Sequence, residues 1–278
     1  MKRLLGLAVS AIALAACDNT APDTSMQETD TAHMEPASSA TERTAGYSED
    51  RNAYFGDLHI HTRSSFDAYI FNVRRTANDA YRFARGETIT HPSGFDMTIA
   101  GGPLDFYTVT DHAEYLGILP VMNTPGTELS KLPRAQDMFS TDPEKITAAF
   151  QSVGASVRSG EVIEEMYDES IIGSVWEQNI DAANRHYVPG EFTTFAAYEF
   201  SPVLSGAGKH HCNVIFNGED LPGHAISAQD VDNAVELWRG LEEACTGDCD
   251  FLTIPHNMNK GWGLFYSRHT WDGRTYET

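Results

Sequence analysis

Segments with strand character alternate with helical segments from residue 54 onward, and this alternation restricts the folds that the chain can adopt. Strands that alternate with helices indicate an α/β fold with a largely parallel sheet. A capping box of Thr76 with Asp79 begins one helix, and Gly86 ends it. We expect strands over residues 54–61, 105–110, 192–198, 213–216 and 251–254, and helices over 76–86, 161–187 and 231–244.

Polar residues that can bind metals lie at the ends of four of these strands. In chain order they are His59 and His61 in the first strand, Asp111 and His112 after the second, Glu199 after the third, and His256 after the fifth. Side chains at the carboxyl ends of parallel strands converge on one face of a barrel or an open sheet. Packing alone does not explain this pattern, so we expect a site there.

His59 and His61 are the strongest single signal for a metal. Residues two apart on a strand point to the same side, so both imidazoles can approach one cation or one each of a close pair. A lone His-x-His also occurs by chance. Here Asp57 precedes the pair and Asp67 follows six residues after His61, which favours a metal site.

The segment Asp57-Leu58-His59-Ile60-His61-Thr62 resembles the first motif of the PHP (polymerase and histidinol phosphatase) superfamily, and Thr110-Asp111-His112 resembles the second. Glu199 and His256 are similar to later ligand positions. Within the superfamily, the chain most resembles a family of larger exported proteins known only as a domain of unknown function. Further segments that carry this likeness are Asp67-Ala68-Tyr69, residues 79–87, residues 110–115, His211-Cys212-Asn213-Val214-Ile215-Phe216 and Ile254-Pro255-His256-Asn257.

The resemblance implies a distorted (β/α)₇ TIM-like barrel with two or three divalent metal ions at its C-terminal face. It implies that Glu199 bridges two metals. Our hypothesis for the mechanism is that Asp111 orients His112 or moves a proton beside it. His210 competes with His211 as a ligand, and we prefer His211 because it directly precedes a strand. The implied metal ligands are His59, His61, Asp67, His112, Glu199, His211 and His256, and the implied catalytic residues are Asp111 and His112.

One departure from the superfamily concerns the end of the sequence. The superfamily supplies a last Asp-x-His pair near the end of its barrel, and no such pair follows His256. Members of the large exported family are also longer. We therefore expect a fragment that is incomplete at its C-terminus, with a complete but reduced domain as the alternative.

The ligand types and the charge of the chain restrict its chemistry. Nitrogen and oxygen ligands without thiolates suit Zn²⁺, Mn²⁺ or Fe²⁺. The net charge of -21 argues against a nucleic-acid partner, because no basic surplus exists to displace counterions. An anionic substrate remains compatible, because bound dications reverse the local field. Arg63 and Lys209 lie near the ligand motifs and are candidates for binding such an anion.

We therefore expect a metal-dependent hydrolase, with a metal-bridging hydroxide that attacks a phosphoester of an exported, anionic small molecule. Two alternatives remain open. The bond can be a sulfate ester, a phosphonate ester or an amide, because the ligands do not choose among them. The protein can also be a lipoprotein that binds a metal or another ligand without catalysis.

The first seventeen residues have the pattern of an export signal. Basic Lys2 and Arg3 precede a short apolar run, and Leu14-Ala15-Ala16-Cys17 resembles the lipobox of bacterial lipoproteins, in which the cysteine is acylated. Residues 18–50 are polar and acidic, which predicts a flexible tether. We expect a metallohydrolase domain over 51–278, with an insertion of short helices around 118–165. The lipid anchor would then be its only membrane contact, at the periplasmic face of the cell envelope.

Cys245 and Cys249 lie four residues apart around a Thr-Gly-Asp turn. An exported protein can keep disulfides, so a local Cys245–Cys249 bond is expected, with metal ligation by this pair as the alternative. Cys212 would then remain a free thiol.

Overall fold

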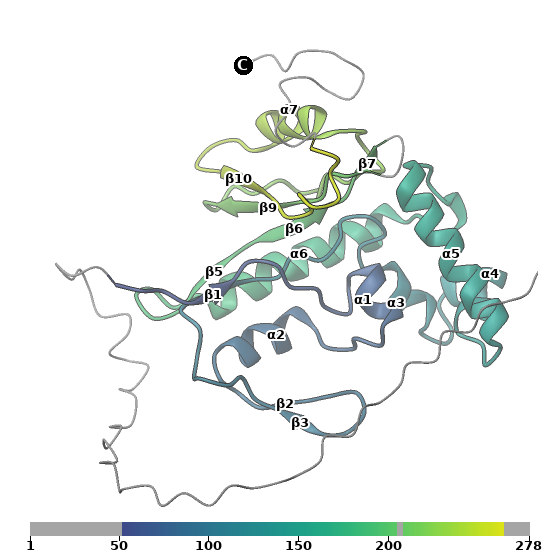
Figure 1. The fold of residues 1–278 in the computed structure, drawn as a ribbon, viewed down its shortest axis with the longest axis horizontal. Coiled ribbons are helices and arrows are strands. Elements are labelled where there is room, and N and C mark those ends of the chain that lie inside the picture. Colours follow the sequence, from purple (N-terminus) through teal and green to yellow (C-terminus); the bar gives the residue numbers. More distant parts are fainter. Residues whose placement is uncertain (1–51, 205–207, 264–278) are drawn as a thin grey trace, which may run out of the picture. The chain divides into compact units, whose positions relative to one another are not determined.

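The computed structural model describes residues 52–204 and 208–263 and shows an α/β fold. Its main strands form two three-stranded sheets, one parallel and one antiparallel. The elements are arranged as in Figure 1. The predicted α/β class is therefore confirmed, but the sheet is not largely parallel.

The first sheet has the strand order β1-β4-β5 and is parallel throughout. It consists of β1 (Gly56–Asp57), β4 (Phe106–Thr108) and β5 (Thr193–Phe195). Gly56 lies opposite Phe106, and a Cβ on Gly56 would collide with the Phe106 carbonyl, so only glycine permits this close pairing. Strand β1 is much shorter than the predicted strand over 54–61, so His59 and His61 follow the strand instead of lying on it.

The second sheet is antiparallel, with the strand order β10-β9-β6. Its strands are β6 (Ala197–Phe200), β9 (Cys212–Asn217) and β10 (Asp250–Pro255). The predicted strand over 192–198 divides at Ala196, so that β5 belongs to the first sheet and β6 to the second. This one segment therefore links the two sheets (Figure 1).

Among the described residues, the strands do not close into a barrel. Strand β10 lies at one edge of the second sheet and β1 at one edge of the first, and the two do not pair. Two short hairpins complete the strands: β2 (Ile89–Thr90) with β3 (Asp96–Met97), and β7 (Val203–Leu204) with β8 (Gly208–Lys209).

Some helices pack beside the sheets, and others belong to the predicted insertion. They are α1 (Phe66–Ile70), α2 (Ala77–Ala84), α3 (Ile118–Met122), α4 (Pro133–Met138), α5 (Pro143–Ser159), α6 (Glu169–His186) and α7 (Ala234–Ala244), with 3₁₀ turns at Leu129–Lys131 and Glu164–Met166. The capping box of Thr76 and Asp79 is present at the start of α2. The insertion contains α3 to α5, and α5 is longer than the short helices expected there.

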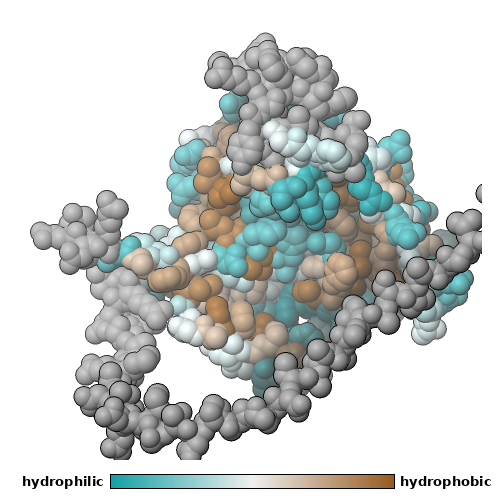
Figure 2. Space-filling model, in the orientation of Figure 1, coloured by the Kyte–Doolittle hydropathy of each residue, from teal (hydrophilic) through white to brown (hydrophobic). Residues whose placement is uncertain are grey.

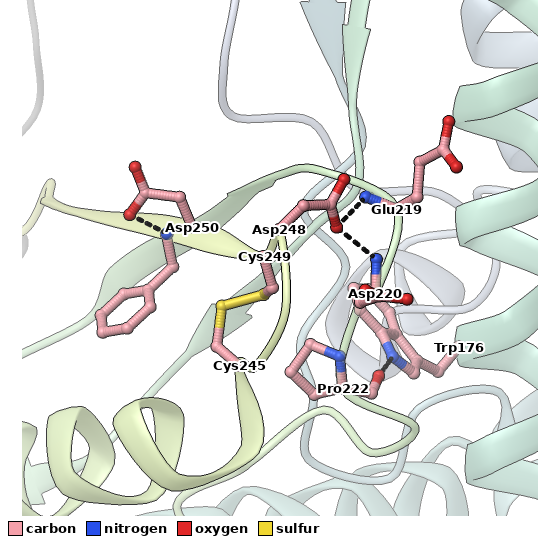
Figure 3. The surroundings of a disulfide bond; sticks show 9 residues. Trp176, Glu219, Asp220, Pro222, Cys245, Asp248, Cys249 and Asp250 are labelled. Atoms are coloured by element: carbon pink, nitrogen blue, oxygen red, sulfur yellow. Dashed lines mark hydrogen bonds between the residues drawn. A yellow bond between two sulfur atoms is a disulfide. The ribbon is translucent and has the colours of Figure 1, made fainter.

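The larger core surrounds Trp176 of α6, which is fully buried. Its ring contacts Tyr198 of β6 and Phe216 of β9, and its Nε1–H donates to the Pro222 carbonyl at 2.7 Å. Figure 3 shows this bond beside the loop that carries Pro222. Helix α6 is therefore fixed to the antiparallel sheet, which also carries Glu199.

Cys245 and Cys249 form the predicted disulfide, and Cys212 is a buried free thiol (Figure 3). The bond closes the turn between α7 and β10. Asp248 within this turn accepts hydrogen bonds from the backbone N–H groups of Glu219 and Asp220, each at 3.0 Å. The disulfide thus supports the contact between the turn before β10 and the segment after β9.

Removal of this disulfide should destabilise the domain moderately. A Cys245→Ser/Cys249→Ser variant frees only a short loop in the unfolded chain, so we expect the free energy of unfolding to fall by about 2 kcal/mol. Urea denaturation of the variant beside the wild type measures this difference. An unchanged midpoint at an unchanged slope would contradict the stabilising role.

The lipobox with Cys17 and the tether over 18–50 lie outside the described residues. None of the helices within 52–204 and 208–263 is long and apolar enough to cross a membrane. On the face drawn in Figure 2, hydrophobic patches are separated by hydrophilic residues.

Candidate metal centre

Glu199, near the end of β6, is the centre of the site. It is only 1% exposed, and both of its oxygens face imidazoles. Oε1 lies 2.7 Å from His211 Nδ1 and 3.1 Å from His256 Nε2, whereas Oε2 lies 2.8 Å from His61 Nε2. One buried carboxylate is thus in direct contact with three histidines from distant parts of the sequence.

Two further histidines complete the surroundings of Glu199. The Nε2 atoms of His59 and His112 each lie 3.8 Å from its Oε2. His112 is placed by the backbone, because it forms a parallel bridge with Glu199 and the flanking Ala113 N–H donates to the Glu199 carbonyl at 2.9 Å. The sheet itself therefore sets the spacing between a histidine and the shared carboxylate.

The rings of His59 and His61 lie close together, although both residues follow the end of β1. Their ring centroids lie 4.9 Å apart. Asn213 of β9 fixes His59, because its Oδ1 lies 3.0 Å from His59 Nδ1 and its Nδ2 donates to the Leu58 carbonyl at 2.7 Å. Asn213 was not predicted as a site residue, although it lies within the quoted segment His211 to Phe216. Its position opposite Glu199 in the β6–β9 register explains its role.

Asp67, in the first turn of α1, lies between two histidines. Its Oδ1 is 3.0 Å from His61 Nδ1 and accepts a hydrogen bond from Ser65 Oγ at 2.6 Å. Its Oδ2 is 3.6 Å from His112 Nε2. Asp67 can therefore act as a ligand with these histidines or orient the His61 ring.

His211 belongs to the cluster, and the antiparallel sheet explains why. It precedes β9, whereas Glu199 lies near the end of β6 and His256 follows β10. Because β9 runs antiparallel to β6 and β10, the first residue of β9 lies beside the last residues of β6 and β10, close to Glu199 and His256. His210 Nε2 instead lies 3.3 Å from the Gly261 carbonyl, so the preference for His211 agrees with this geometry.

The carboxylate of Asp111 contacts Thr62 and Asn179. It is fully buried, and its carboxylate accepts hydrogen bonds from the Thr62 backbone N–H, from Thr62 Oγ1 at 2.7 Å and from Asn179 Nδ2 at 3.3 Å. A role of Asp111 in orienting His112 or moving a proton beside it therefore stays a prediction. Asp111 links Thr62, the residue after His61, to Asn179 of α6. Its carboxylate is buried, so water does not compete for these hydrogen bonds.

The polar neighbours of His112 Nδ1 are Ser201 and Glu114, neither of which was predicted as a site residue. Ser201 Oγ lies 2.6 Å and Glu114 Oε2 3.3 Å from His112 Nδ1. Glu114 lies two residues after His112 within the quoted segment over 110–115, so that segment carried a signal for it. Ser201 had no comparable signal, since its contact depends on the pairing of β6 with the segment around His112.

The two candidate anion-binding residues lie beside this cluster in the chain. Arg63 is exposed on the segment after His61, and its backbone N–H donates to the Arg75 carbonyl at 2.9 Å. Lys209 ends β8 and is half-buried, and its backbone N–H donates to the Lys260 carbonyl at 3.0 Å. Their role in substrate binding stays a prediction.

The contacts shift the pKa values of the central residues in opposite directions. Burial would raise the pKa of Glu199, but His112 and hydrogen bonds from the other histidines outweigh it and hold this pKa well below its usual range. Burial would lower the pKa of His61, but hydrogen bonds to Asp67 and Glu199 outweigh it and raise this pKa to about 9. Glu199 is therefore an anion that needs a nearby positive charge.

This balance predicts a pH dependence for the metal-free protein. The pKa of His61 is about 9 when folded and near 6.5 when unfolded, so its contribution to stability is complete below pH 6.5 and is lost as the pH rises to about 9. We expect a loss of at most about 3 kcal/mol in chelator, measured by urea denaturation across this range. A His61→Gln variant should show a shallower dependence, and equal slopes for both proteins would contradict the assignment.

The residues present fit a metal centre. Three overlapping groups of donor atoms each lie within 4.8 Å: His59 with Glu199 and His256, His61 with Asp67 and His112, and His112 with Glu199 and His211. All donors are imidazole nitrogens or carboxylate oxygens, which suit divalent transition metals. A cation there would supply the positive charge that protonated imidazoles supply otherwise.

The fold and this cluster define the chain as an α/β protein with histidine and carboxylate groups that can hold metal ions. The family model described as "Protein of unknown function (DUF3604)" matches residues 48–278, so the chain belongs to this family. The comparisons with the curated proteins and with the solved structures found no match.

Proposed function

We propose that this protein is a metal-dependent hydrolase of the PHP type that cleaves phosphoesters. The observation that carries this proposal is the buried Glu199 carboxylate with five imidazoles around it and Asp67 beside two of them. Such a group is costly to bury unless cations compensate it. Two or three ions of Zn, Mn or Fe would meet this requirement.

The residues that would hold the ions come from both sheets and from α1, so that Glu199 is shared. They are His59, His61, Asp67, His112, Glu199, His211 and His256. When bound, such ions act as Lewis acids toward a phosphoryl group and lower the pKa of water. We also propose that the α/β fold is related to the TIM-like barrel of the PHP type.

The side chains of the cluster differ in solvent exposure, and this difference indicates the side that is open to a substrate. The side chain of His59 is 41% exposed, whereas those of Glu199 and His112 are buried. Substrate would therefore approach from the side of His59 and His61. Exposed Arg63, two residues after His61, would bind the anionic part of the substrate, as guanidinium groups do with phosphate.

We also propose that the protein is exported and held at the cell envelope by a lipid on Cys17. Labelling with radioactive palmitate tests this directly, and a Cys17→Ser protein should take up none. Equal labelling of both proteins would remove the basis for the anchor.

A substrate panel tests the proposed reaction. The protein, reconstituted with Zn, Mn or Fe in separate samples, is given a phosphomonoester, a phosphodiester, a sulfate ester, a phosphonate ester and an amide. Turnover of a phosphoester that disappears in His59→Ala would support the proposal. Turnover of the sulfate ester, the phosphonate ester or the amide would show that the enzyme cleaves that bond instead. Bound metal without turnover would favour a binding protein.

A further inference from the structure

The buried side of the His112 ring is held by two groups that the proposed chemistry does not use. Ser201 Oγ lies 2.6 Å from His112 Nδ1, and Glu114 Oε2 lies 3.3 Å from the same nitrogen. Ser201 and Glu114 are both fully buried. The opposite nitrogen, Nε2, faces Asp67 Oδ2 at 3.6 Å and Glu199 Oε2 at 3.8 Å.

Hydrogen-bond directions determine which nitrogen of this ring carries a proton. The Ser201 hydroxyl donates to Glu199 Oε1 at 3.2 Å, because a carboxylate can only accept. Its single proton is then used, so its oxygen accepts from His112 Nδ1–H. Glu114 Oε2 makes no hydrogen bond, but its negative charge 3.3 Å from Nδ1 also favours a proton on this nitrogen. Both neighbours therefore place a proton on Nδ1, which leaves Nε2 available to a ligand on the Glu199 side.

Glu114 itself is held rigidly by the backbone. Its Oε1 accepts hydrogen bonds from the N–H of Ser201 at 3.1 Å and from the N–H of Ala228 at 2.9 Å. One oxygen is thus committed to two backbone donors, and only Oε2 is directed at His112. Rotation of the carboxylate would break both backbone bonds, so its position relative to the ring is fixed.

We propose that Ser201 and Glu114 are positioning residues that keep the proton of His112 on Nδ1 and present its Nε2 to a metal. This inference rests on the proposed function, in which His112 is a metal ligand. Ligand histidines in proteins are commonly oriented by such a carboxylate or hydroxyl at the other nitrogen. Asn213 Oδ1 has the same relation to His59 Nδ1, at 3.0 Å.

His211 and His256 differ from His112 in the surroundings of their second ring nitrogen. Within the part of the chain that the structure describes, the buried Nε2 of His211 and Nδ1 of His256 have no hydrogen-bond partner. Their rings are therefore oriented only through Glu199 and packing. At His112, by contrast, Ser201 and Glu114 lie at the nitrogen that faces away from Glu199, so we infer that they control its tautomer.

Glu114→Gln tests this directly in the full-length protein. The amide oxygen can keep both backbone bonds, and the NH₂ group then points at His112 Nδ1 and requires it to accept. We expect the proton to leave Nδ1, seen in the ¹⁵N chemical shifts of His112 in the metal-free protein at a pH at which this ring is neutral, with the signals assigned by their loss in His112→Gln. Zinc affinity should fall by 10–100-fold.

Ser201→Ala is the second variant, and Ser156→Ala is its matched control. Ser156 is also buried, but it bonds to the Tyr115 hydroxyl outside the cluster. We expect Ser201→Ala to weaken zinc binding about 10-fold and Ser156→Ala to leave it unchanged. Equal zinc affinities of the two serine variants, or a proton that stays on Nδ1 in Glu114→Gln, would overturn the proposal. A wild-type protein that binds no metal would contradict the proposed function, while the ¹⁵N measurement would still decide the tautomer.

Discussion

Glu199→Gln should reduce the bound metal to at most one equivalent. Glu199 belongs to two of the three groups of donor atoms, so its loss removes an anionic ligand from both. The group of His61, Asp67 and His112 does not include it and can still hold one ion. We expect elemental analysis to show this fall, and the affinity of the lost ions to drop by more than about 100-fold, beyond the effect of a supporting residue.

Asp67→Asn is the matched control for this experiment. It also replaces a carboxylate with an amide near His61 and His112, but it affects only the group that lacks Glu199. It should therefore remove one ion and leave those at Glu199. If Glu199→Gln retained the metal content of the wild type, the shared role of this carboxylate would be wrong.

Asp111→Ala should destabilise the domain by about 3 kcal/mol or more. The change leaves the Thr62 N–H, the Thr62 hydroxyl and the Asn179 amide without their buried acceptor. Each such unsatisfied group costs about 1–3 kcal/mol. Thr62 directly follows His61, so the loss also releases the segment that carries this ligand. Urea denaturation in chelator separates this effect from any loss of metal.

Asp111→Asn is the corresponding control, and its loss should be clearly smaller. The amide keeps one acceptor oxygen for the Thr62 backbone N–H. The Thr62 hydroxyl can instead accept from the new NH₂ group, and the Asn179 amide can turn its oxygen toward it. Equal stabilities of Asp111→Ala and the wild type would show that Asp111 does not hold the His61 segment.

The residues of the cluster were more predictable than the elements that carry them. His59, His61, His211 and His256 converge on the Glu199 carboxylate, as the motifs and their positions at strand ends implied. Motifs of this kind fix residue types at set spacings in the chain. The predicted disulfide was equally local, since both cysteines lie in one turn.

The sheet arrangement was less predictable because it depends on contacts between distant segments. Nothing local to Ala196 shows that the chain changes sheets there, and nothing local to β9 shows that it runs antiparallel. Asn213 and Ser201 could not be identified as site residues for the same reason. The contacts of Asp111 with Thr62 and Asn179 could not be predicted either, because only the fold brings these residues together.

The central claim is that the histidine and carboxylate cluster holds divalent metal ions. Elemental analysis of the purified protein, beside a His59→Ala/His61→Ala variant, tests it most directly. We predict two or three equivalents of Zn, Mn or Fe in the wild type and a clear loss in the variant, with circular dichroism showing that both are folded. A folded wild-type protein that takes up no metal after reconstitution, or a variant that keeps all of it, would contradict the account.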